Sequence, residues 1–298
     1  MKIALTGASG RVGAFVGADL VENGHDVVAV DLVAPTDERV EYRPADIGNI
    51  DELAEAFGGC DAVIHLAAIP EANIEPFDVT FRINAQGTVN CLEAASRVGA
   101  ERFVFASSEA VLGFPYREVD FKPDYFPIDE GHRLQPQDSY GVSKVAAEEA
   151  CRAFTRRGAL STVCVRPCYC WGTSLGEEAI ESILNPELHY QSLWVYIHLR
   201  DIARIYRLAC EHPAITHETF YAVADDIRSN VPTSVLVDRF YPGVPFKRDL
   251  GEYGSLIAND RVREVLDFKP SIGWRDEVPA ADIPTTLGPA ADATRDEG

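Results

Sequence analysis

The chain opens with KIALTGASGRVG, residues 2–13, in which three glycines spaced three apart follow a short apolar run. We expect residues 2–6 to form a short buried strand and residues 14–22 to form an amphipathic helix that ends at Asn23-Gly24. A strand, a glycine loop and a helix in this order are the context in which spaced glycines bind a dinucleotide. The sequence therefore predicts a dinucleotide site at the start of the chain.

Each glycine of this loop has a distinct expected role. Gly7 permits the tight turn, Gly10 lets the backbone approach a pyrophosphate, and Gly13 allows the helix to pack closely on the strand. The N-terminus of the helix then offers free amides and a positive dipole end to the phosphates. The next strand, DVVAVD at residues 26–31, ends in a carboxylate that can bind the adenosine ribose and repel a 2′-phosphate. Asp31 therefore favours NAD over NADP.

A second motif, Tyr140-Gly-Val-Ser-Lys144, carries the groups of a proton-transfer site. Residues 143–154 are rich in Ala and Glu and predict a helix, on which side chains four apart share one face. A tyrosine has an unperturbed pKa of about 10, and a nearby ammonium lowers it. The hydroxyl groups of Ser107-Ser108 can hold a reacting oxygen.

Taken together, these motifs resemble the extended short-chain dehydrogenase/reductases, also described as the NAD-dependent epimerase/dehydratase family. The spacing Gly-x-x-Gly-x-x-Gly is that of this family, and the likeness covers about residues 1–275. The other matching segments follow in the family's order: Asp46-Ile47 at the adenine, a fourth strand at 61–68, the Asn-x-x-Gly-Thr motif at 84–88, and a fifth strand at 102–108 that ends in the catalytic serine.

The resemblance implies a role for each catalytic residue. Tyr140 is the base in oxidation and the acid in reduction, Lys144 binds the nicotinamide ribose and lowers the pKa of Tyr140, and Ser108 positions the substrate oxygen. Ser107 packs or supports the backbone, and Asn84 fixes the backbone near the site rather than relaying protons. The residues expected around NAD are Gly7, Ser9, Gly10, Arg11, Val12, Gly13, Asp31, Asp46, Ile47, Leu66, Ala67, Ala68, Asn84, Tyr140, Lys144 and Pro167.

The alternation of strand and helix signals predicts an α/β fold with a Rossmann-type doubly wound parallel sheet and a small C-terminal substrate lobe. We expect an NAD-binding core over residues 1–167 that includes the catalytic residues. A substrate lobe over 168–276 is interleaved with the last core elements, and the acidic stretch 277–298 is expected to be a disordered tail. Asp201, within a family motif that precedes a late helix, is expected to cap that helix.

The net charge of −20 excludes some partners. The 27 basic residues are five lysines and 22 arginines and form no basic stripe, so we expect no nucleic acid and no membrane partner. Excess acid with few lysines is typical of proteins from a salty cytoplasm, and predicts low stability in dilute buffer. No signal segment or long apolar run is present, and the seven cysteines indicate a reducing cytoplasm. A metal site formed by Cys164, Cys168, Cys170 and His189 is conceivable, but no metal is expected.

The segment 168–197, which should border the substrate, contains no Lys or Arg. Family members that act on nucleotide sugars need a larger lobe with cations for the diphosphate, so a small neutral polyol fits better. Four aromatic residues could stack on a sugar or pack in the core: Tyr169, Trp171, Tyr190 and Trp194. The candidate substrate residues are Ser108, Glu109, Cys168, Tyr169 and Trp171.

The leading hypothesis is an NAD-dependent sugar dehydrogenase that oxidises a free aldose or a uronate at the anomeric carbon to a lactone. The small lobe resembles those of uronate and archaeal sugar dehydrogenases; neutral sugars rank before uronates because the segment lacks cations. The alternatives are a nucleotide-sugar 4-epimerase or dehydratase with tightly bound NAD, and a non-catalytic NAD-binding protein. The family also implies a homodimer built on a four-helix bundle. The roles of Glu109 and of the insert 114–139, as a lid or a surface loop, stay open.

Overall fold

The computed structural model describes residues 1–172, 183 and 185–276, so the expected C-terminal tail at 277–298 lies outside the described residues. Its main sheet has seven parallel strands in the order β3-β2-β1-β4-β5-β6-β9. This order, with β1 at the point where the winding reverses, confirms the Rossmann-type doubly wound fold. The strands are Lys2–Thr6 (β1), Asp26–Asp31 (β2), Glu41–Pro44 (β3), Ala62–His65 (β4), Arg102–Ala106 (β5), Ser161–Pro167 (β6) and His217–Ala222 (β9).

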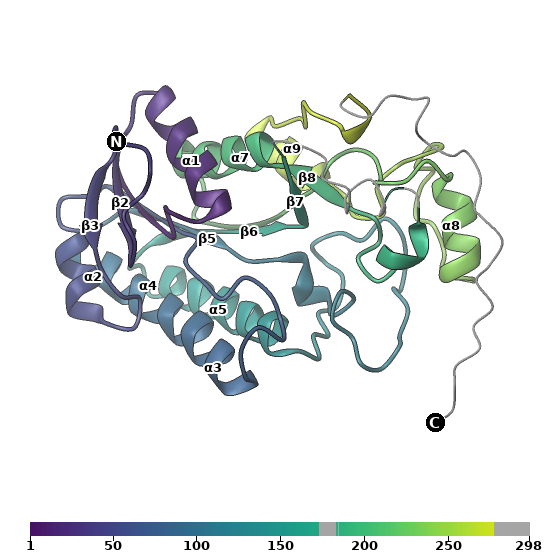
Figure 1. The fold of residues 1–298 in the computed structure, drawn as a ribbon, viewed down its shortest axis with the longest axis horizontal. Helices are drawn as coiled ribbons and strands as arrows, with labels where there is room; N and C mark the ends of the chain where they lie inside the picture. The colour runs from purple at the N-terminus through teal and green to yellow at the C-terminus, as the bar shows by residue number, and fades with distance from the viewer. Residues whose placement is uncertain (173–182, 184, 277–298) are drawn as a thin grey trace.

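Helices cover both faces of the sheet (Figure 1). One face carries Arg11–Glu22 (α1), Leu199–Glu211 (α7) and Asp260–Leu266 (α9). The other carries Ile50–Ala56 (α2), Phe77–Phe81 (α3), Gly87–Val98 (α4) and Ser139–Arg156 (α5), with the π-helical turn Arg82–Gln86 joining α3 to α4. None of the helices in the described part of the chain is long and apolar enough to cross a membrane.

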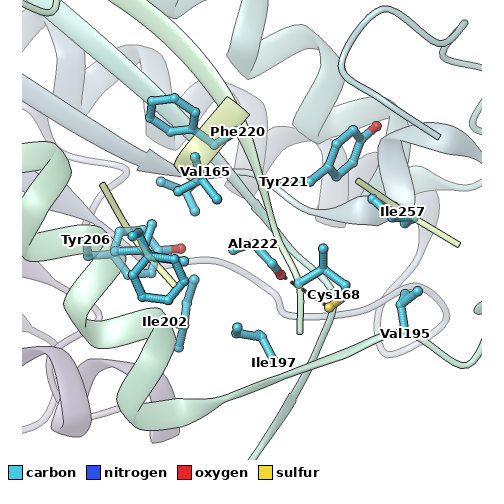
Figure 2. Packing of buried hydrophobic residues seen from close by; sticks show 14 of the residues in the cluster. Val165, Cys168, Val195, Ile197, Ile202, Tyr206, Phe220, Tyr221, Ala222 and Ile257 are labelled. Atoms are coloured by element: carbon cyan, nitrogen blue, oxygen red, sulfur yellow. Dashed lines mark hydrogen bonds between the residues drawn. The ribbon is translucent and has the colours of Figure 1, made fainter. Parts of the chain in front are cut away.

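Alternating side chains of each strand fill two cores, one on each side of the sheet. On β1, Ile3 and Leu5 pack in the core beneath α1 and α7, whereas Ala4 packs in the core beneath α2, α4 and α5. Figure 2 shows the first of these cores where β6 and β9 meet α7, with Val165 near Phe220. Both faces of the central strands are therefore buried, as expected for a parallel sheet.

The smaller lobe contains the short parallel pair Tyr169–Trp171 (β7) and Tyr196–His198 (β8), and the helix Thr233–Phe240 (α8). The insert 114–139 also belongs to it. Phe126 and Ile128 are buried, and their N–H groups donate to the carbonyls of Pro245 (2.9 Å) and Leu256 (2.8 Å). The middle of the insert is thus part of the lobe's core and not a surface loop.

The expectation that Asp201 caps the late helix is wrong. The cap of α7 is His198, whose Nδ1 accepts a hydrogen bond from the N–H of Arg200 at 3.1 Å. Asp201 is fully buried in the first turn, where its carboxylate accepts the N–H groups of Ser271 (2.7 Å) and Ile272 (3.1 Å). It therefore holds a distant segment of chain against α7, a contact that a local pattern does not reveal.

A buried ion pair joins α5 to the sheet. The Glu148 carboxylate accepts both Nε (2.8 Å) and Nη2 (2.7 Å) of Arg166 on β6, and also the Ser107 hydroxyl (2.6 Å) at the end of β5. Arg166 further donates to the Tyr221 hydroxyl on β9 at 3.1 Å. Both charged side chains are buried, so neither can form hydrogen bonds with water. Each supplies the hydrogen bonds that the other needs.

Replacing Glu148 with Ala leaves the Arg166 guanidinium buried without its carboxylate. We expect the free energy of unfolding to fall by about 3–5 kcal/mol, measured by chemical denaturation. Glu149→Ala is the matched control, since the neighbouring carboxylate forms only exposed ion pairs with Arg152 and Arg156 and should cost less than about 1 kcal/mol. Equal losses in the two variants would contradict a structural role for the buried pair.

Candidate active site

A cavity of about 1480 Å³ lies at the carboxyl ends of the central strands, where ligands bind in doubly wound sheets. All but one of the residues predicted to surround NAD line it: Gly7, Ser9, Gly10, Arg11, Val12, Gly13, Asp31, Asp46, Ile47, Leu66, Ala67, Ala68, Tyr140, Lys144 and Pro167. The sequence motifs therefore converge on one continuous space.

The glycine loop is packed too tightly for side chains. Gly7 has a φ of +71°, and a Cβ on it would lie 2.7 Å from the backbone nitrogen of Ala67. A Cβ on Gly13 would lie 2.0 Å from the carbonyl oxygen of Gly7. Helix α1 starts one residue after Gly10 with no side-chain cap, which leaves its first N–H groups for a ligand. These features suit the pyrophosphate of a dinucleotide.

The adenosine end of the cavity is fixed by carboxylates that bind backbone. Asp31 accepts the N–H groups of Ser9 (3.0 Å) and Leu32 (2.7 Å), and so its side chain is held at the end of β2. Asp46 accepts the N–H of Gly48 at 2.8 Å, and the side-chain amide of Asn90 donates to the Ile47 carbonyl at 2.9 Å.

Asn84 is the predicted cofactor residue that does not line the cavity. It is buried behind the wall, where Oδ1 accepts the N–H of Ile69 (2.8 Å) and Nδ2 donates to the Ile69 carbonyl (3.0 Å). Nδ2 also donates to the Ser143 hydroxyl at 3.2 Å. Its amide thus ties a wall segment to α5, which agrees with the expected support of the backbone.

Ser108, Tyr140 and Lys144 line the same cavity. The Ser108 hydroxyl accepts the N–H of Ala110 at 3.1 Å and so caps the 3₁₀ turn Glu109–Leu112. Lys144 donates to the Ala106 carbonyl at 2.7 Å, and its Nζ lies 5.3 Å from the centre of the Tyr140 ring. The three side chains come from the end of β5 and the first turns of α5.

A glycine brings these two elements together. Gly141 is in the first turn of α5, beside Tyr140, and a Cβ on it would lie 2.6 Å from the Ala110 carbonyl oxygen. The carboxylate of Asp138 caps this turn by accepting the N–H of Gly141 at 2.8 Å. Only a glycine lets α5 begin this close to the turn that follows Ser108, a role that sequence reasoning missed.

Burial dominates the ionisation of the catalytic groups. It raises the pKa of Tyr140 above its usual value, and the Ser108 hydroxyl only partly opposes this. It also lowers the pKa of Lys144 to about 7, against the field of Glu148. The net direction for Tyr140 is opposite to the expected one, because removal from water disfavours both the phenolate and the ammonium that should support it.

Of the candidate substrate residues, Glu109, Cys168 and Tyr169 line the cavity beside Ser108, whereas Trp171 does not. Trp171 is 2% exposed and stands edge-on to Tyr196, with ring centres 6.2 Å apart. The other two aromatic candidates also pack in the lobe: Trp194 is fully buried, and Tyr190 stacks on Phe240. Of the four, Tyr169 is the one that faces the cavity.

Other segments bring further residues to this end of the cavity, and these were not predicted from the sequence. Tyr116, from the insert, and Tyr206, on α7, line the cavity. Arg228 follows β9 and lies with its guanidinium 4.1 Å above the Tyr169 ring. No local motif marks these positions, since each is distant in sequence from the residues it joins. No three His, Cys, Asp or Glu side chains of the described residues are arranged to hold a metal ion.

Two relatives of known function are similar to this chain in sequence. A NAD-dependent glucose-6-phosphate dehydrogenase from Haloferax volcanii is 30% identical over 76% of this chain and 86% of its own length. A UDP-glucose 4-epimerase from Corynebacterium glutamicum is 27% identical over 93% of this chain and 91% of its own length.

Among solved structures, a short-chain dehydrogenase/reductase superfamily protein from Agrobacterium tumefaciens with bound NAD has a TM-score of 0.70 and 26% identity, covering 92% of this chain and 93% of that one. NAD is therefore the cofactor, as Asp31 and the glycine loop predict. The model of the NAD dependent epimerase/dehydratase family matches residues 3–224, which confirms the resemblance seen in the motifs: this chain belongs to that family.

Proposed function

We propose that the protein oxidises a CH–OH group of a small sugar, an aldose or a uronate, at the anomeric carbon to give a lactone. The observation that carries the proposal is that Ser108, Tyr140 and Lys144 line one cavity whose neighbouring wall is poor in basic side chains. The cavity-lining residues from segments 109–116 and 168–170 include no Lys or Arg. Arg228, which lies beside this wall, is 2% exposed and packed against the Tyr169 ring, so it offers a nucleotide diphosphate little positive charge there. The hydroxyl groups of a free sugar need none.

In this proposal Tyr140 removes the proton of the reacting hydroxyl, and the Ser108 hydroxyl holds the oxygen from which it leaves. Lys144 binds the ribose of the cofactor beside the Tyr140 ring. NAD, when bound, supplies the acceptor for the hydride. The contribution of the chain is the orientation of these groups and the exclusion of water, with no covalent intermediate.

The two relatives support different outcomes. The dehydrogenase from Haloferax volcanii supports net oxidation of a sugar, while the epimerase from Corynebacterium glutamicum supports a reaction that leaves the redox state of NAD unchanged. The alternative function is therefore a nucleotide-sugar 4-epimerase or dehydratase with tightly bound NAD. Formation of NADH with free aldoses or uronates distinguishes the two, since an epimerase produces none.

We further propose, as the family implies, a homodimer, in which the lobe of 168–276 with the insert binds the sugar. Phe77 and Phe81 on α3 are exposed apolar side chains that an interface with a second copy would cover. A reducing cytoplasm is supported by the cysteines, all seven of which are free thiols.

Tyr140→Phe removes the base and keeps the ring. We expect kcat for sugar oxidation to fall by about 10²- to 10⁴-fold, with the Kd for NAD unchanged in a fluorescence titration. Tyr125→Phe is the matched control: its hydroxyl binds Asp129 outside the cavity, and its loss should leave kcat as it is. If Tyr140→Phe turns over as fast as the wild type, Tyr140 is not the base.

The choice of NAD rests on one side chain, because the Asp31 carboxylate is held by two backbone amides at the ribose end of the cavity. Asp31→Ala should weaken NAD binding about tenfold, a loss of ~1.4 kcal/mol, and should improve NADP binding. The control is Asp37→Ala, which breaks an exposed pair with Arg39. If the NAD to NADP ratio of Kd values does not change in Asp31→Ala, another group selects the cofactor.

We also propose adaptation to high salt, on the basis of the net charge of −20. Repulsion between surface carboxylates is screened over about 10 Å at 0.1 M salt but over about 3 Å at 1 M. The midpoint of urea unfolding should therefore rise between 0.1 and 2 M KCl. A midpoint that is independent of KCl would place the protein among ordinary acidic enzymes.

A further inference from the structure

Glu109 is a buried carboxyl group that the proposed chemistry does not use. It follows Ser108 directly, begins the 3₁₀ turn Glu109–Leu112, and is 8% exposed. Its side chain lines the cavity together with Ser108 and Tyr169. Since Ser108 holds the reacting oxygen in the proposed reaction, the neighbouring carboxyl group stands where the rest of the substrate must lie.

The positive charge that acts on Glu109 comes from Arg228, without a direct ion pair between the two among the described residues. Arg228 is 2% exposed, and its Nε has no hydrogen-bond partner in the described structure. Its guanidinium lies against the Tyr169 ring, 4.1 Å from the ring centre. The Glu109 carboxyl group accepts the backbone amide of Tyr169 but has no side-chain partner comparable to the one that Arg166 gives Glu148, so part of its hydrogen-bonding capacity remains for a ligand.

The single backbone amide of Tyr169 does not replace all the hydrogen bonds that a carboxyl group makes in water. Burying a carboxyl group costs free energy unless hydrogen bonds replace those to water, and the buried carboxyl groups of Glu148 and Asp201 obtain such bonds from the protein. Glu109 faces the cavity, so the groups that complete its hydrogen bonding are those of the molecule bound there. Sugar hydroxyl groups both donate and accept, and thus match a carboxyl group in either protonation state.

We propose that Glu109 is a specificity-determining residue that hydrogen-bonds a hydroxyl group next to the reacting carbon and restricts the enzyme to uncharged aldoses. This inference rests on the proposed oxidation of a free sugar. It narrows the substrate class, because the carboxylate of a uronate would meet a like charge when Glu109 is ionised, and a neutral aldose would not.

The protonation of Glu109 should make the preference between neutral and charged sugars depend on pH. Burial raises its pKa to about 8, opposed by Arg228 and by the backbone amide of Tyr169. Burial raises the pKa values of the other titratable groups around it, so they lose their protons well above this pH. These groups are Cys168 and Cys170, which follow β6, and Tyr116 of the insert. Lys144, with a pKa of about 7, titrates in the same range and acts on every substrate.

The test compares kcat/KM for matched sugars, glucose with glucuronate and galactose with galacturonate, from pH 6.5 to 9.5. A group with a raised pKa is neutral below it and charged above it, so repulsion of the uronate grows as pH rises through about 8. In the wild type the ratio of aldose to uronate should therefore rise over this range. Effects of Tyr140 and Lys144 common to both sugars cancel in the ratio.

Glu109→Gln keeps the shape and removes the charge. We expect its aldose to uronate ratio to be independent of pH, apart from any residual slope from Lys144, and kcat/KM for aldoses to fall about tenfold, equal to ~1.4 kcal/mol. The Kd for NAD should not change. Glu149→Gln, on the exposed face of α5, is the matched control and should behave as the wild type.

The outcomes separate this inference from the function on which it rests. A wild type that oxidises no free sugar overturns the proposed function and the inference with it. A wild type that oxidises sugars but prefers uronates, or whose ratio is flat with pH, overturns the inference alone. The same holds if Glu109→Gln is indistinguishable from the wild type. Because the wild-type ratio needs no variant, poor folding of Glu109→Gln leaves that readout intact.

Discussion

The site depends on the buried ion pair between Glu148 and Arg166. Glu148 is one helical turn after Lys144, and its carboxylate also holds the hydroxyl of Ser107, the residue before Ser108. One carboxylate thus fixes the distance between α5, which carries Tyr140, and the segment after β5, which carries Ser108. Arg166 is followed by Pro167 and the segment that forms the substrate end, so the same pair orients that wall of the cavity as well.

The chemistry of the site is set by burial more than by charge. Three ionisable side chains, Tyr140, Lys144 and Glu109, have their pKa values shifted toward the neutral form by removal from water. At pH 7 Tyr140 and Glu109 are therefore mostly neutral, while Lys144, with a pKa of about 7, is about half protonated. Charge that develops during a reaction in such a place interacts strongly with the few dipoles and ions around it. The stabilisation of that charge then depends mainly on how the Ser108 hydroxyl and the Lys144 amine are oriented.

Local patterns predicted what depends on neighbouring residues. The strands at 2–6 and 26–31 have the expected ends, and α1 begins three residues earlier than expected because its first turn is part of the glycine loop. Contacts between distant segments were not predictable in this way. Arg228 reaches Tyr169 across about sixty residues, Asp201 binds a loop seventy residues away, and Trp171 turns into the lobe's core. The pKa of Tyr140 likewise depends on burial, which only the folded chain defines.

The insert at 114–139 limits how the substrate specificity of such a protein can be altered by exchanging segments of its chain. Its backbone pairs with residues around Pro245 and Leu256, and Glu130 accepts the N–H of Tyr221 at 3.0 Å. The smaller lobe is therefore assembled from two stretches of chain that are separated by α5. A chimera that takes only the C-terminal stretch from a relative must keep the chain path around Pro245 and Leu256 to preserve these backbone pairs. New specificities on this scaffold require both stretches to be exchanged together, or point changes at the cavity wall.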